Sequence, residues 1–168
     1  AEAKKFFIEL FRIAKWRRTG ILWWNVMDGW PQFSDAVVDY YFKPKLAYYF
    51  IKRVQQDVCV MMDEPNSWVQ KIVVVNDTAS DKKIKCEIKD IDTGEIVFQG
   101  EFIAYGDSST VIGQVPYIRN KQRFFVISWE GEVRGQNHYL AGQPPFDLET
   151  YKNWIIGSKL YSNVLVDF

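Results

Sequence analysis

Three tryptophans and an aspartate stand close together in residues 20–41, which read GILWWNVMDGWPQFSDAVVDYY. Tryptophan is an unusual choice for a buried core, because it is large and its indole N–H needs a partner when buried. Beside a carboxylate it suits a sugar, since the ring covers the apolar C–H face and the carboxylate accepts from hydroxyls. The candidate substrate-binding residues are therefore Trp23, Asp28 and Trp30.

Each residue of this stretch also has a plain structural interpretation. Asp28 and Trp30 lie on the loop that leaves a predicted strand, where ligands are commonly met, but an aspartate before a glycine is also ordinary turn chemistry. Both interpretations stay open. Trp24 faces the opposite side of that strand from its neighbour, so we expect it to pack against flanking helices. Asp35 and Asp39 are expected to form a cap and a solvated or salt-bridged loop.

The elements that must position this stretch make up the first third of the chain. Apolar residues at three- and four-residue spacing predict a helix over residues 2–18, which Gly20 ends. Residues 21–27 are nearly all apolar and predict a strand covered on both faces, as in a parallel sheet. The segment PKLAYYFIKRV, residues 44–54, predicts a second helix. A helix, a strand and a helix are an excerpt from an α/β fold, and alone they cannot complete a parallel sheet.

Beyond residue 56 the hydrophobic period becomes alternating, which marks a domain boundary. Isoleucine and lysine alternate over residues 83–89, which predicts a strand with one buried face and one solvent-exposed face. Asp92-Thr93-Gly94 then provides a hairpin turn. The predicted strands cover residues 57–62, 68–75, 83–89, 96–102, 109–117, 123–129 and 133–140, and a short helix covers 146–156. Short strands at this spacing predict an immunoglobulin-like antiparallel β-sandwich, so the fold class is mainly β.

Composition and charge exclude several classes of partner. The chain has 168 residues, enough for one domain and a piece of another, and its 21 Lys and Arg balance 21 Asp and Glu, which disfavours nucleic-acid binding. No apolar run approaches the roughly 18 residues of a membrane span, so we expect a soluble chain without a membrane partner. There is no G-x-S-x-G, no Cys–His pairing and no Gly-rich phosphate loop, so a complete small enzyme is not expected.

Four further positions are interpreted as structural, and no cofactor or metal is predicted. Cys59 and Cys86 sit in apolar alternating runs and are expected to be buried, reduced thiols. His138, the only histidine, has no Cys or His at metal-ligand spacing and is expected to be a strand residue with a satisfied ring. Residues 76–78, Asn-Asp-Thr, match a glycosylation acceptor but are interpreted more simply as a turn.

Residues 20–53, GILWWNVMDGWPQFSDAVVDYYFKPKLAYYFIKR, resemble the end of the catalytic barrel in glycoside hydrolase family 2, which holds β-mannosidases, β-galactosidases and β-glucuronidases. In that family a Trp-rich eighth barrel strand ends in an Asp and a Trp-Pro, and an Asp-Tyr segment leads through Pro-Lys to a closing helix. The later segments IVVVNDT (residues 72–78) and NHYLAGQPPFDLETY (residues 137–151) resemble parts of the family's sandwich domains less specifically.

The resemblance implies a particular arrangement. The chain would be a C-terminal piece of a retaining hydrolase, with residues 1–56 as the end of its (β/α)8 TIM barrel and residues 57–168 as the sandwich. Trp23 would form the floor of the site under the sugar. The alternative is that Trp23 only packs within the barrel. Retaining enzymes need two carboxylates roughly 5 Å apart, and the family's glutamates lie on earlier strands. Neither Glu2 nor Glu9 matches them, so the isolated chain is expected to be inactive.

Two other functions compete with this interpretation. The sandwich could bind carbohydrate by itself, for which Trp68, Trp129 and Tyr139 are the candidate aromatic platform. It could instead be a structural spacer, which we rank higher because its aromatic residues mostly occupy alternating strand positions. The barrel piece would leave apolar surface without its partners, so self-association through residues 1–55 is also expected.

Overall fold

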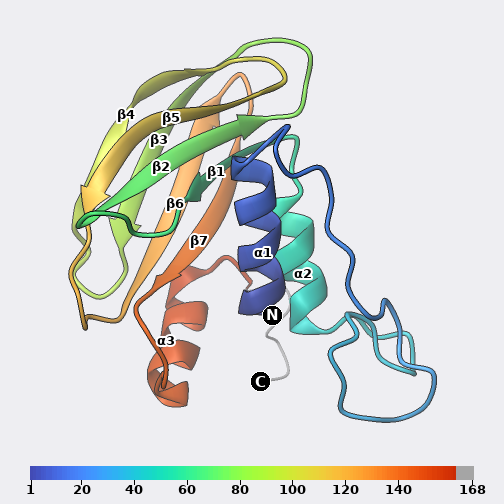
Figure 1. Cartoon of the computed structure of the whole chain (residues 1–168). Coiled ribbons are helices and arrows are strands. Elements are labelled where there is room, and N and C mark those ends of the chain that lie inside the picture. Colours follow the sequence, from blue (N-terminus) through green and yellow to red (C-terminus); the bar gives the residue numbers. More distant parts are fainter. Residues whose placement is uncertain (162–168) are drawn as a thin grey trace. The chain divides into compact units, whose positions relative to one another are not determined.

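The computed structural model describes residues 1–161 and divides the chain into two compact units, Ala1–Gln56 and a second that begins at Asp57. Among the described residues, the first unit contains helices α1 and α2, and the second contains strands β1 to β7 and helix α3 (Figure 1). No described helix is both long enough and apolar enough to cross a membrane.

In the first unit, helices α1 (Glu2–Ile13) and α2 (Leu46–Val54) carry the core. The Arg12 side chain of α1 donates from Nη1 to the Val54 carbonyl at the end of α2, which satisfies one of the carbonyls that a helix end leaves free. α1 is shorter than the predicted 2–18, because Trp16 has a left-handed φ of 70° that an α-helix cannot include. The buried core residues are Ile8, Val37, Ala47, Ile51 and Val54.

The strand predicted over residues 21–27 is wrong. In the described part of the chain this segment makes a single isolated parallel bridge, between Met27 and Val38, and Leu22 is fully exposed. An apolar run becomes a strand only where at least one neighbouring strand pairs with its backbone in a continuous ladder. Residues 21–27 lack such a ladder in the first unit, so the apolar pattern is present without the strand.

Backbone hydrogen bonds hold three short pieces of the long α1–α2 connection together. The Asp28 amide donates to the Val38 carbonyl at 3.1 Å, and the Val38 amide donates to the Val26 carbonyl at 2.9 Å. The Lys45 amide, just before α2, donates to the Val37 carbonyl at 2.9 Å. Residues 26–28, 36–39 and 43–45 therefore lie side by side, and the loop of residues 29–35 projects from them.

The second unit is an antiparallel β-sandwich, as predicted from the sequence. Its sheets have the orders β1-β2-β5 and β4-β3-β6-β7. In β3, Ile84, Cys86 and Ile88 are buried, and the lysines between them face solvent, which is the alternation seen in the sequence. The strands are β1 Val58–Met62, β2 Val69–Asn76, β3 Lys82–Asp90, β4 Ile96–Ala104, β5 Ser108–Pro116, β6 Arg123–Gly131 and β7 Gly135–Ala141.

Side chains from distant parts of the chain close the sandwich. Asn137 in β7 donates from Nδ2 to the Val60 carbonyl in β1 at 3.0 Å and so joins the two sheets. Helix α3 (Leu148–Ser158) packs Trp154 against the Phe124 ring, 6.0 Å between centroids, and donates the Trp154 indole N–H to Asp92 at 2.6 Å. The helix predicted over residues 146–156 is thus present, shifted by two residues.

Candidate functional site

Trp23 is half-buried and packs against the core of the first unit. The Lys4 ammonium of α1 lies 5.7 Å from the centroid of its ring, within the range of a cation–π contact. The Trp23 indole Nε1 is buried and has no hydrogen-bond partner among the described residues. The core residues therefore fix the ring on one side.

Asp28 is buried, with 2 % of its surface exposed, and its carboxylate gathers three side-chain donors. The Lys45 ammonium donates to Oδ2 at 2.7 Å, and Oδ1 accepts from the Ser34 hydroxyl and, at 3.2 Å, from the Gln32 amide. The hydrogen bond from Lys45, followed by that from Ser34, lowers the pKa of Asp28 below its usual value. The carboxylate is an ionised centre of a local network. Whether it also accepts from a sugar stays a prediction.

Trp30 is the exposed member of the three predicted residues. It lies on the 29–35 loop, and 64 % of its surface is accessible. Trp24, which was expected to pack against helices, is 81 % exposed, so that expectation is wrong. The reason is the missing strand: without the pleat that alternates side chains between two covered faces, nothing in the first unit buries it.

The three predicted residues thus occupy three environments: a packed ring, a buried carboxylate and an exposed ring. Lys4 links the Trp23 ring to the 29–35 loop, because its ammonium also lies 3.4 Å from the Asp35 carboxylate. Sequence reasoning missed Lys4, Lys45, Ser34 and Gln32. Of these four, only Lys45 could have been suspected from the sequence, because a lysine beside the predicted start of the second helix would need a carboxylate partner.

The other singled-out polar residues are structural, as expected. Asp35 forms the ion pair with Lys4, and Asp39 accepts the Lys43 amide N–H at 2.8 Å in a turn. His138 is fully buried in β7, stacks on Phe124 and bonds through Nδ1 to the Tyr161 hydroxyl at 2.9 Å. Cys59 and Cys86 are buried free thiols.

Asn76, the first residue of the glycosylation-like triplet, is fully buried. Its Nδ2 donates to the Ser80 and Ala104 carbonyls, both at 2.9 Å, while its Oδ1 accepts from the Thr78 amide and hydroxyl. The triplet is therefore a turn, and its amide nitrogen is inaccessible.

The aromatic platform required by a carbohydrate-binding sandwich is mostly absent from the surface. Trp129 and Tyr139 are buried, at 3 % and 8 % exposed, and belong to the sandwich interior. Trp68 is 65 % exposed, but it stands on the connection before β2. One exposed ring makes a weaker sugar platform than the three that the sequence offered.

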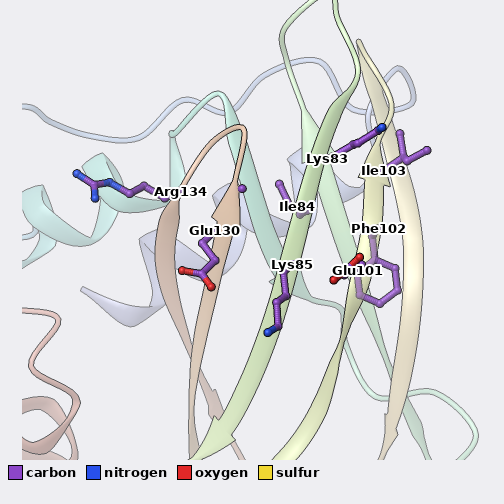
Figure 2. A pocket seen from close by; sticks show the side chains of 9 residues that line it. Lys83, Ile84, Lys85, Glu101, Phe102, Ile103, Glu130 and Arg134 are labelled. Atoms are coloured by element: carbon purple, nitrogen blue, oxygen red, sulfur yellow. The ribbon is translucent and has the colours of Figure 1, made fainter.

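A shallow hollow on strands β3, β4 and β6 is lined mainly by charged side chains (Figure 2). Lys85 stands opposite Glu101 on one neighbouring strand and Glu130 on the other, the cross-strand arrangement that stabilises a wet sheet face. Its aromatic ring, Phe102, stacks on Phe98 at 5.5 Å. The hollow is a largely charged, solvated face, and Phe102, its one aromatic ring, is already stacked on another side chain. Within residues 1–161 no cluster of three or more His, Cys, Asp or Glu is arranged to hold a metal ion.

Comparison with known proteins finds relatives named β-mannosidase B, although no family model matches the chain. β-Mannosidase B of Thermothelomyces thermophilus is 32 % identical over 162 residues, covering 80 % of this chain and 18 % of that protein. β-Mannosidase B of Aspergillus niger is 38 % identical over 68 residues, covering 35 % of this chain and 8 % of that protein.

Solved structures give the same result. A β-D-mannosidase from Dictyoglomus thermophilum matches with a TM-score of 0.69 and 29 % identity, covering 83 % of this chain and 18 % of that one. The exo-chitosanase CsxA of Amycolatopsis orientalis matches with a TM-score of 0.59 and 15 % identity, over 76 % and 16 %, and supports the fold alone.

These matches confirm the resemblance to glycoside hydrolase family 2. The chain is similar to β-mannosidases over most of its length. It spans less than a fifth of the relatives that it matches.

Proposed function

We propose that this chain is the C-terminal region of a retaining glycoside hydrolase that cleaves β-glycosidic bonds, with the catalytic glutamates on another part of that parent protein. The first unit supplies one wall of the sugar site as the end of the catalytic barrel, and the sandwich is an accessory domain. The observation that carries the proposal is Trp30, an exposed ring on a hydrogen-bonded loop of a β-mannosidase-like chain.

The proposed division of labour follows from the chemistry of the side chains. Trp30 and Trp23 offer apolar ring surface to the C–H face of a β-linked sugar, and Asp28 stands between them in the sequence as the charged residue of the wall. Glu9 is no candidate for the reaction, because it is buried and paired with Lys5 at 2.7 Å. We therefore propose that the two carboxylates of a retaining mechanism lie elsewhere in the parent, as the family resemblance implies.

The test of the wall is sugar binding by the full 168-residue chain. Methyl β-D-mannopyranoside is titrated while the indole N–H signals are followed by NMR, and we expect weak binding, with a Kd of about 1 mM or more, that moves the Trp30 signal. Trp30→Ala should abolish it. Trp68→Ala is the matched control, because the two rings are equally exposed, at 64 % and 65 %. Binding that is lost with Trp68→Ala instead would contradict the wall and support the carbohydrate-binding sandwich.

The second test concerns activity. The purified chain should not hydrolyse aryl β-mannosides or aryl β-galactosides, since one wall cannot place two carboxylates across the scissile bond. Turnover that follows the protein through chromatography and disappears when a carboxylate of this chain is changed to an amide would refute the proposal.

A structural spacer is the second candidate for the sandwich domain alone. The burial of Trp129 and Tyr139 and the charged hollow on β3, β4 and β6 favour it over a binding module. Unchanged sandwich signals throughout the same sugar titration are the expected result for a spacer.

A further inference from the structure

The loop of residues 29–35 is built around the Asp28 carboxylate. Two side chains of the loop itself, Gln32 and Ser34, turn inward and donate to Oδ1. The Ser34 hydroxyl oxygen also accepts the Ala36 amide N–H at 3.0 Å, where the loop ends. A seven-residue loop whose own side chains bond one central group has a defined conformation, as in compact surface loops with close ends.

Lys45 holds the same carboxylate from the far side of the connection. Its ammonium reaches Oδ2 at 2.7 Å and the Ser34 carbonyl at 3.4 Å, although it lies 17 residues away from Asp28 in the chain. The Asp28 side chain has no exposed surface, whereas 27 % of the Lys45 side chain is exposed. A buried carboxylate with a charged partner and two neutral donors is strongly held, because each bond to an ionised group is stronger than a neutral one.

The loop presents large aromatic side chains to solvent, while Gln32 and Ser34 bond to the Asp28 carboxylate. Phe33 is fully exposed, and Trp30 is 64 % exposed. Exposed aromatic rings are costly for a flexible loop to hold in place, and binding loops gain affinity when the bound conformation exists beforehand. The hydrogen bonds to the Asp28 carboxylate order the loop and do not involve the exposed Trp30 and Phe33 rings.

We propose that Asp28 is a positioning residue, which together with Lys45 fixes the 29–35 loop so that the Trp30 ring is held ready for a sugar. The sugar contact rests on the function proposed above, but the ordering of the loop does not and can be measured without any sugar. Asp28 acts through Trp30 and need not touch the ligand.

The test uses the full chain with ¹⁵N-labelled tryptophan. Asp28→Asn and Lys45→Met should each narrow the Trp30 indole signal and move it toward the random-coil position, and the affinity for methyl β-D-mannopyranoside should fall about tenfold. Lys45→Arg, which keeps the charge, should restore part of both. Asp39→Asn and Lys52→Met are the controls, because Asp39 accepts in an exposed turn and Lys52 is exposed on α2. The Trp154 signal, from the sandwich, reports that the second unit is folded.

Lowering the pH protonates the Asp28 carboxylate and so tests the same network without a variant of Asp28. The groups that face it are Lys45, Ser34 and Gln32, and the lowered pKa means that the ion pair persists below the ordinary value of 3.8 and is lost as the pH falls further. The Trp30 signal should therefore change below that pH, in Asp35→Asn as in the unaltered chain.

The outcomes separate the two proposals. A Trp30 signal that is insensitive to acid, or unchanged in folded Asp28→Asn and Lys45→Met, overturns the positioning role. An ordered loop that responds to both variants in a chain that binds no mannoside supports the positioning network and contradicts the sugar wall.

Discussion

At the scale of single residues, the buried amide of Asn76 ties several parts of the sandwich together. It bonds two carbonyls and caps a turn in the same place, so both ends of the amide are used. Asn76→Asp replaces the donor with a carboxylate that faces those carbonyls, and we expect a loss of about 1–3 kcal/mol in the free energy of unfolding. Urea denaturation measures this. Asn66→Asp, at an exposed site, should change the midpoint little, and equal effects of the two substitutions would contradict the account.

The buried thiol of Cys86 gives a prediction about reactivity. Burial, with a smaller contribution from Glu87, raises the pKa of Cys86 to about 12. Since the thiolate is the nucleophile, the folded chain at pH 8 should react with a disulfide reagent only as fast as the sandwich opens. The measured rate should rise with urea in step with unfolding. Rapid labelling of Cys86 in the folded state would show that the strand is not buried.

Residue chemistry and the family resemblance made Trp23, Asp28 and Trp30 the candidate sugar-binding residues, and their role stays a prediction. Neither the residue chemistry nor the resemblance indicated the partners of Asp28. Lys45 is 17 residues away, and the bond depends on how residues 26–28, 36–39 and 43–45 come to lie together. That arrangement is set by backbone pairing, which leaves no periodic trace in so short a stretch.

At the scale of elements, the strands of the second unit could be predicted almost to the residue, whereas the strand at 21–27 could not. An antiparallel strand with one wet face, such as β3, carries its own pattern of lysine and isoleucine. A strand buried on both faces carries only apolarity, and it forms when neighbours pair with it. The sequence shows the apolar run but not whether the neighbours are present.

Gly131, at the end of β6, is a position where the close approach of two strands should exclude a side chain. Its φ is +140°, and a Cβ there would lie 2.5 Å from the Lys83 carbonyl oxygen of β3. Gly131→Ala should therefore destabilise the sandwich by about 1–3 kcal/mol, measured by urea denaturation. Gly157→Ala, in α3, meets only Ile91 at 3.4 Å and should be neutral or stabilising. A Gly131→Ala chain as stable as the original would show that β3 and β6 are not this close.

At the scale of the whole molecule, the first unit exposes an unusual amount of apolar surface. The most exposed large side chains between α1 and α2 are Trp16, Leu22, Trp24, Val26, Trp30, Phe33, Tyr41 and Phe42. Surfaces of this kind associate in water, so we expect the 168-residue chain to self-associate through residues 1–55. Light scattering should give a concentration-dependent mass for the full chain and a monomer mass for residues 57–168. A monodisperse full-length monomer would contradict the prediction.

The bond from Asn137 to the Val60 carbonyl also governs the order of events when the protein is made. It spans 77 residues, so this contact between the sheets cannot form until β7 has been made. At a synthesis rate of about 5–20 residues per second, roughly 4–15 s pass between the addition of Val60 and that of Asn137. During that interval β1 can pair with β2, but its buried valines and methionines lack the cover that β7 provides in the folded sandwich.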